Sequence, residues 1–342
     1  SWTSTSSYPN TKLKPERTKS WEVGLDARIL NDISLNLTYY RSNTYNQTFY
    51  ADLSLSSGYS NIPIQSGNIM NEGLEMSLGY NKQWKDFSFN TNYTLTWNKN
   101  RVKRLADGVY NYATGQPIQM PELSPLTYGH TDARLILRVG GSMGDVYGQR
   151  LLKRDLNGYI LNEEGVGLAM ENKETYLGSI LPKMNMGWSL GFGYKGVNLG
   201  MTFTGRFGGI VISETQSVLD AAGVSKVSAD VRDAGGVQIN QSKVSAQTYY
   251  QTIQGTAAYY TYSATNVRLG ELSLSYTLPK KWFDNKVGMT VGLVGKNLWM
   301  IYCKAPFDPE LTTSAASNFY QGFDAYMLPS TRNFGFNVKF QF

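Results

Sequence analysis

Few side chains in this chain are suited to acid–base, nucleophilic or metal chemistry. His130 is the only histidine and Cys303 the only cysteine. No serine in a strand–turn–helix elbow accompanies His130, so the residues do not predict a nucleophilic enzyme. A single cysteine forms neither a disulfide framework nor a cysteine-based metal site, and we expect Cys303 to be a packed thiol near a strand end. We therefore expect no catalytic residues and no enzyme activity.

The stretch RDLNGYILNEEG, residues 154–165, is the best candidate for a metal site. Its oxygen donors are Asp155, Asn157 and Glu163 or Glu164. A calcium loop of the EF-hand type also needs an oxygen donor at its fifth position and glycine at its sixth, where this stretch has Tyr159 and Ile160. We therefore expect a polar turn and assign no metal and no cofactor. A calcium site near Asp155 is the alternative.

Aromatic side chains in two long stretches are the best candidates for binding a ligand or a partner. Residues 248–262 hold five tyrosines, and residues 299–332 add further rings. Tyr and Trp supply large, rigid contacts with a polar edge, which suits the recognition of sugars, peptides or a protein partner. The predicted binding residues are Tyr249, Tyr250, Tyr259, Tyr260, Tyr262, Phe319, Tyr320 and Phe323. The alternative for any one ring is that it packs the loops against each other.

The charge of the chain argues against nucleic acid as a partner. The net charge of +6 is spread over 342 residues without a dense run of Lys and Arg, whereas nucleic-acid binding favours a clustered basic stripe. No apolar run reaches the about 18 residues of a membrane helix. Only 17% of the residues are charged, below the roughly 25% of soluble domains. Asn, Ser, Thr, Gly and Tyr supply the polarity, which favours an all-β protein with one wet face.

The candidate residues are positioned by segments in which apolar and polar residues alternate strictly. The clearest are residues 21–29, 74–80, 87–99, 184–194, 197–207 and 287–293. A period of two is typical of a β-strand with two unlike faces. Residues 267–278 switch phase midway, so we expect a β-bulge near Gly270.

The chain ends on the same pattern at residues 333–342. Its apolar positions are Phe334, Phe336, Val338, Phe340 and Phe342. We expect this set to face lipid and the polar or glycine residues between them to face a polar interior. A last strand with a terminal aromatic is similar to the assembly signal of outer-membrane barrels. A C-terminal strand in a soluble β-sandwich is the alternative.

Short and long connections alternate along the chain. The short polar turns are at 31–32, 82–86, 195–196 and 279–286. The long stretches, expected to be irregular extracellular loops, are at about 45–71, 100–132, 208–266 and 299–332. Such loops count against a compact soluble domain but are expected on the outside of an outer-membrane barrel. With a further hairpin at 133–139 and 146–154, about eleven strands of about 9–11 residues result. The predicted fold is all-β: a transmembrane, antiparallel, up-and-down β-barrel.

Six stretches form an ordered series of motifs. They are LKPERTKSWEVGLDARIL (13–30), SGNIMNEGLEMSLGY (66–80), ATNVRLGELSLSYTLPK (264–280), GKNLWMIY (295–302), APFDPE (305–310) and LPSTRNFGFNVKFQF (328–342). Together they resemble the SusC-like family of TonB-dependent outer-membrane transporters. The second stretch departs from the family pattern, because Leu74 separates Gly73 from Glu75. No single stretch is specific, but the six in order cover most of the chain.

The resemblance implies a barrel of about twenty-two strands around an N-terminal plug domain. Residues 1–342 would be the C-terminal half of that barrel, next to a plug and a barrel half that are not in this chain. It further implies active import of oligosaccharide or peptide cargo, with a SusD-like surface lipoprotein as partner. Energy would come from TonB through a segment absent from this chain. The location would be the lipid of a Gram-negative outer membrane, crossed many times. The alternatives are a plug-less porin, a secretion or structural barrel, and a soluble all-β binding module.

Overall fold

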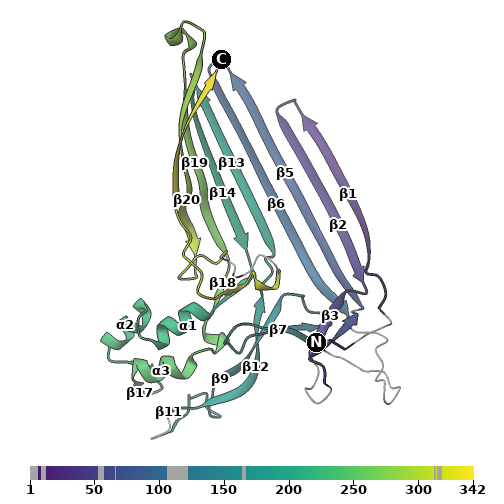
Figure 1. Cartoon of the computed structure of the whole chain (residues 1–342), viewed down its shortest axis with the longest axis vertical. Coiled ribbons are helices and arrows are strands. Elements are labelled where there is room, and N and C mark those ends of the chain that lie inside the picture. Colours follow the sequence, from purple (N-terminus) through teal and green to yellow (C-terminus); the bar gives the residue numbers. More distant parts are fainter. Residues whose placement is uncertain are drawn as a thin grey trace, which may run out of the picture.

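Nine long strands form one antiparallel sheet (Figure 1). The computed structural model describes residues 7–8, 13–52, 58–65, 67–105, 122–163, 167–311, 313 and 318–342. The strands in sheet order are β1 (Arg17–Ile29), β2 (Ile33–Tyr45), β5 (Asn68–Trp84), β6 (Phe87–Arg104), β13 (Met184–Tyr194), β14 (Val197–Phe207), β19 (Asn266–Leu278), β20 (Gly288–Cys303) and β22 (Asn333–Gln341). The antiparallel all-β prediction is confirmed. None of the helices in the described ranges has the length and hydrophobicity of a membrane-spanning helix.

The register gives the sheet two unlike faces. Directly opposed residues of neighbouring strands lie on the same face. One row across six strands is Phe336, Leu293, Leu274, Leu199, Phe192 and Phe89. The neighbouring row, which lies on the other face, is Asn337, Gly292, Ser275, Asn198, Gly193 and Ser88. The strict alternation along each strand thus adds up to one apolar face and one polar face.

A bulge at Gly270 keeps β19 in phase with its neighbour. Thr202 pairs with Glu271, and the next residue, Phe203, pairs with Leu269, so that Gly270 has no opposed residue in β14. The extra residue places Leu269 on the same apolar face as Leu272 and Leu274, which follow the bulge. The predicted bulge is confirmed.

Tight turns join the long strands at the end of the sheet where the chain terminates (Figure 1). Leu30 and Asn31 have φ values of 50° and 59°, and Lys195 and Gly196 have values of 46° and 88°. Two successive residues with positive φ are the signature of the type I′ hairpin turn, whose twist matches that of the flanking strands. The turn after β19 is longer and contains the short 3₁₀ helix η3 (Lys280–Phe283).

The long connections gather at the opposite end of the sheet (Figure 1) and fold into what we call the loop domain. It contains a sheet of β7 (Glu122–Thr127), β8 (Arg134–Arg138), β9 (Asp145–Leu152) and β12 (Met170–Ser179), and a sheet of β15 (Ile210–Ser213), β18 (Thr261–Ser263) and β21 (Phe323–Asp324). Its helices are α1 (Glu214–Ala221), α2 (Lys226–Asp233), α3 (Ala246–Ile253), η2 (Ala257–Tyr259) and η4 (Asn318–Tyr320). Its strand pairs are β3 (Thr48–Asp52) with β4 (Asn61–Gln65), β10 (Asn162–Glu163) with β11 (Gly167–Leu168), and β16 (Val237–Ile239) with β17 (Ser242–Val244).

The expected hairpin at 133–139 and 146–154 forms, but it was assigned to the wrong sheet. Its strands are β8 and β9, which belong to the loop domain, so the long sheet has nine strands in the described ranges and not the predicted eleven or so. The reason is visible in β8, where Leu135, Ile136 and Leu137 are all buried. A run covered on both faces belongs to an interior sheet, whereas the strands of the long sheet alternate.

The stretch at 208–266, expected to be irregular, contains the α-helices α1, α2 and α3 of the loop domain. Each helix begins after a serine whose hydroxyl accepts a hydrogen bond from the amide three residues on. These caps are Ser213 to Gln216 (2.9 Å), Ser225 to Ser228 (3.0 Å) and Ser245 to Thr248 (3.1 Å). Such caps satisfy amides that have no partner inside a helix. They are the sequence signal for these helices that the prediction missed.

Candidate functional site: the loop domain

Three of the predicted binding residues form one aromatic cluster around Tyr128. The ring centroids of Tyr128 and Phe323 are 5.3 Å apart, and those of Tyr128 and Tyr320 are 6.2 Å apart. The Tyr128 hydroxyl donates to the carbonyl oxygen of Phe319 over 2.7 Å. Phe323 is buried, while Phe319 and Tyr320 are half-buried. Tyr128, which the sequence prediction passed over, is fully buried, and this burial raises the pKa of its phenol.

The five tyrosines of residues 248–262 lie in or beside a second cluster. Tyr250 and Tyr260 are buried in it. Tyr249 and Tyr259 are half-buried against it, and the Tyr259 hydroxyl accepts a hydrogen bond from the amide of Leu152 over 3.0 Å. Tyr262 is half-buried and packs edge-on against Phe307, and burial raises its pKa to about 12.

Burial divides the eight predicted binding residues into two groups. Tyr250, Tyr260 and Phe323 are at most 7% exposed, so packing, the alternative given above, is their role in this structure. The half-buried residues are Tyr249, Tyr259, Tyr262, Phe319 and Tyr320. Binding by these five stays a prediction, since a large ring that keeps an exposed edge can contact a partner without refolding of its surroundings.

A buried ion pair ties the loop domain to the polar face of the long sheet. Arg268 of β19 donates to both carboxylate oxygens of Asp308, over 2.9 and 2.8 Å, and the two side chains are 10% and 8% exposed. Glu310 adds a carboxylate oxygen 3.3 Å from the same guanidinium. Burial alone would raise the pKa of the Asp308 carboxyl, but the hydrogen bonds from Arg268 and from the Glu310 amide outweigh burial and lower it. Such a bidentate pair fixes geometry as well as charge.

Two further carboxylates join separate segments of the loop domain. Glu214, the first residue of α1, is buried and accepts from the Nδ1 atom of His130 over 2.9 Å and from the Tyr326 hydroxyl over 3.3 Å. Asp132 accepts from the amides of Arg150 (2.7 Å) and Ala257 (2.6 Å). His130 therefore contacts a structural carboxylate.

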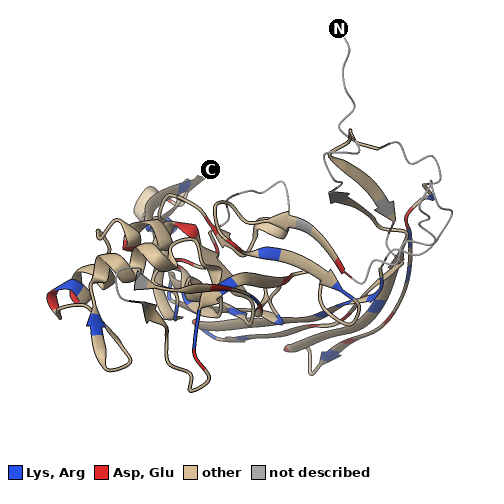
Figure 2. Cartoon of the chain, turned by 90° about the horizontal axis from the view of Figure 1, so that it is seen from below, with Lys and Arg blue, Asp and Glu red and all other residues tan. Residues whose placement is uncertain are grey.

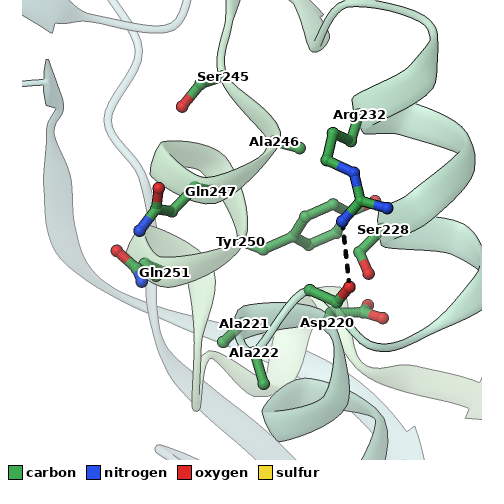
Figure 3. Close-up of a pocket in the computed structure, with 11 residues that line it drawn as sticks. Asp220, Ala221, Ala222, Ser228, Arg232, Ser245, Ala246, Gln247, Tyr250 and Gln251 are labelled. Carbon is green, nitrogen blue, oxygen red and sulfur yellow. Dashed lines mark hydrogen bonds between the residues drawn. The ribbon is translucent and has the colours of Figure 1, made fainter.

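A cavity of about 480 Å³ lies between the three helices (Figure 3). Its lining includes Asp220 at the end of α1, Arg232 of α2, and Tyr250 of α3. In Figure 3 the guanidinium of Arg232 and the carboxylate of Asp220 lie on the same side of the cavity as the Tyr250 ring. No motif in the sequence pointed to Asp220 or Arg232.

The expected polar turn at 154–165 is present where the structure describes it. The Oδ1 atom of Asp155 accepts hydrogen bonds from the amides of Asn157 and Tyr159 over 2.9 and 2.8 Å. An Asp side chain commonly holds a turn in this way. Glu164 lies outside the described residues, and among those described no group of three or more metal-ligating residues occurs.

The predicted assembly strand is β22, which pairs with β20 from Gly288–Gln341 to Lys296–Asn333. Its large apolar side chains are exposed on one face, with Phe334 at 80%, and Phe342, directly after the strand, is 97% exposed. The role of this strand in assembly stays a prediction.

Comparisons with known proteins agree on one family. The model described as "TonB dependent receptor-like, beta-barrel" matches residues 1–298. TonB-dependent receptors P3 and P26 of Formosa agariphila are 26% and 24% identical over 97% of this chain. The structure of the RagAB peptide importer in the "open-open" state aligns with 98% of this chain, with a TM-score of 0.67 and 19% identity. The "closed-closed" state aligns with 95% of this chain, with a TM-score of 0.65 and 18% identity. Both structures share the fold of this chain.

The chain spans 35% of the length of each of these relatives and structures. The family match covers most of the chain, and the fold agrees with it over nearly the full length. The resemblance to SusC-like transporters is thereby confirmed as membership of the TonB-dependent receptors. This chain belongs to the TonB dependent receptor-like β-barrel family.

Proposed function

We propose that this chain is part of the barrel of an outer-membrane transporter that imports nutrients with energy from TonB. The observation that carries the proposal is the placement of the loop domain relative to the polar face of the sheet. Arg206 and Arg268, both at the loop end of that face, hold the loop domain through Ile180 and Asp308. Seen along the strands, the sheet is an arc; part of the loop domain lies over its concave side, while the helices extend past one edge of the sheet (Figure 2). A polar interior below a folded mouth suits selective passage of a polar cargo.

The apolar face of the sheet supports the membrane location in this proposal. Charged residues are scarce in the rows of opposed residues that cross this face, and large side chains such as Leu293 and Phe336 are exposed there. A lipid-facing band of this kind, closed by further strands from outside this chain, leaves no unpaired edge in hydrocarbon. The chain would then cross a Gram-negative outer membrane many times and surround a plug supplied by the rest of the protein.

The proposed partner is a SusD-like surface lipoprotein that lies over the loop domain, and the proposed cargo is an oligosaccharide or a peptide. The family membership and the fold shared with the RagAB peptide importer support an importer. The half-buried rings of Tyr249 and Tyr262 are candidates for the contact, because a partner can cover their remaining exposed surface. TonB would be engaged by a segment outside residues 1–342.

The proposal is tested with the full-length protein in its native membrane. Uptake of the candidate oligomers should stop when TonB is removed, and mass spectrometry of the mildly extracted complex should show plug peptides and a surface lipoprotein. Replacing Tyr249 and Tyr262 by Ala should weaken the lipoprotein or cargo association while barrel yield stays unchanged. Steady, TonB-independent conductance in a planar bilayer would contradict the proposal and favour a porin or secretion barrel.

A further inference from the structure

The cavity between α1, α2 and α3 is open because most of its wall is made of small residues. These are Ala221, Ala222, Gly223, Ser228, Ser245 and Ala246. The three helices pack on one another beside the cavity, and each has a serine N-cap. The walls of the cavity are therefore held in place by the fold. Its volume of about 480 Å³ is in the range of pockets that bind small molecules. Figure 3 shows these walls and the polar side chains that reach between them.

The floor of the cavity carries a buried carboxylate with acceptor capacity left over. Asp220 is 5% exposed. Its Oδ1 atom accepts hydrogen bonds from Gln216, over 2.7 Å, and from Ser225. Its Oδ2 atom accepts none from the described residues. A buried carboxylate favours a cationic donor that completes its hydrogen bonds.

The rim carries a guanidinium whose donors are nearly all unused. Among the described residues, Arg232 makes one hydrogen bond, of 3.5 Å to the carbonyl oxygen of Gly223, and one contact of 3.9 Å with the exposed Asp233. Both distances are at the limit of such interactions. Arg232 forms no ion pair with Asp220 in the described structure, although both line the cavity. Two opposite charges therefore line one cavity without pairing with each other in the described structure.

We propose that this cavity binds a free α-amino acid as a zwitterion. The ammonium group would donate to Asp220 Oδ2, and the carboxylate would accept from the guanidinium of Arg232, which suits carboxylates geometrically. The amides of Gln247 and Gln251 at the rim would face the side chain of the ligand. A sugar fits less well, because the ring on which it would stack belongs to Tyr250, which is 7% exposed and packed edge-on against Tyr249. This site is separate from the polar face of the sheet and does not depend on the proposed import.

The test is calorimetric binding to the full-length protein in detergent, with L-serine as the probe. L-serine should bind, whereas N-acetyl-L-serine and L-serine amide, which lack the ammonium and the carboxylate respectively, should bind at least tenfold more weakly. D-glucose serves as the neutral, hydroxyl-rich alternative. Absence of L-serine binding, equal binding of the blocked compounds, or binding of D-glucose instead would each overturn the proposal.

Variants of α2 make the test specific to the cavity. Arg232→Gln should weaken L-serine binding at least tenfold. Lys226→Gln removes a positive charge from the same helix outside the cavity and should leave binding unchanged. Asp220→Asn retains an oxygen for Gln216 and Ser225 and should likewise lose binding, with the circular dichroism spectrum as the check of folding. Equal affinities of the Arg232 and Lys226 variants would refute the assignment.

Discussion

The buried ion pair between Arg268 and Asp308 should control whether the segment after β20 stays docked on the long sheet. The perturbation is Asp308→Asn, which keeps the size of the side chain and removes its charge. In the native structure both carboxylate oxygens accept from Arg268 over 2.9 and 2.8 Å, with both side chains about nine-tenths buried. The amide offers one acceptor and turns an N–H₂ group towards a cation. The buried guanidinium of Arg268 would then keep one acceptor at position 308 and lose the negative charge.

Removing one member of a buried, hydrogen-bonded pair costs about 3–5 kcal/mol, because the remaining charge stays desolvated. Glu310 lies 3.3 Å from the same guanidinium and remains as a partner, so we expect about 3 kcal/mol, the lower end of that range. This corresponds to a roughly 100-fold larger open population of the segment. The cost is local, because the rows of paired residues in the long sheet do not depend on it.

Hydrogen exchange of the full-length protein measures that opening. The amide of Ile212 donates to the carbonyl oxygen of Gly322 over 2.8 Å, so its protection reports whether the segment that follows Asp308 is docked. Protection there should fall about 100-fold in Asp308→Asn and remain unchanged in β5 and β6. Glu310→Gln is the matched control and should have a smaller effect, since Glu310 is 39% exposed. Unchanged protection of Ile212 in Asp308→Asn would mean that the ion pair does not hold the segment in place.

The same pair predicts a pH dependence. The pKa of Asp308 is lowered in the folded protein, because the hydrogen bonds from Arg268 and the Glu310 amide outweigh the effect of burial. A group whose pKa is lower in the folded state stabilises that state fully above its unfolded pKa, and the stabilisation disappears as pH falls through the folded value. The free energy of opening should therefore be constant between about pH 5 and 7 and decrease in stronger acid. In Asp308→Asn this acid-dependent decrease should be absent.

Three further predictions concern the long sheet. Leu199→Arg should cost about 2–4 kcal/mol of barrel stability if the apolar face meets mid-bilayer lipid. Asn198→Arg on the polar face is its control. Equal denaturation midpoints for the two variants would contradict the assignment of the faces. Deletion of Phe342 should lower the yield of assembled barrel in the outer membrane, and an unchanged yield would contradict the assembly role. Gly73→Ala should destabilise the sheet by about 1–3 kcal/mol, because a Cβ atom would lie 2.6 Å from the carbonyl oxygen of Trp97; a wild-type midpoint in urea would show that the strands move apart freely.

The two faces of the long sheet, its tight turns and its bulge could all be predicted from the amino-acid pattern. Each of these features is local: alternation follows the side-chain period of a strand, and Asn31 is a residue type that tolerates the positive φ of a hairpin turn. The switch of phase at Gly270 could be read from the same alternation. The order of the motifs then indicated the family. The predicted number of strands in the long sheet was too high, at about eleven instead of nine in the described ranges.

The structure of the long connections, in contrast, depends on contacts between segments that are far apart in the sequence. Whether β8 joins the long sheet depends on what covers its second face, and the buried run from Leu135 to Leu137 shows that both faces are covered. The pairing of Arg268 with Asp308 spans 40 residues, and the cavity of Asp220 and Arg232 exists only because three short helices pack around it. Local periodicity holds no information on such contacts, since each depends on which distant segments fold against each other. For the same reason, no pattern in the sequence separated the buried Tyr250 and Tyr260 from the rings that keep an exposed edge.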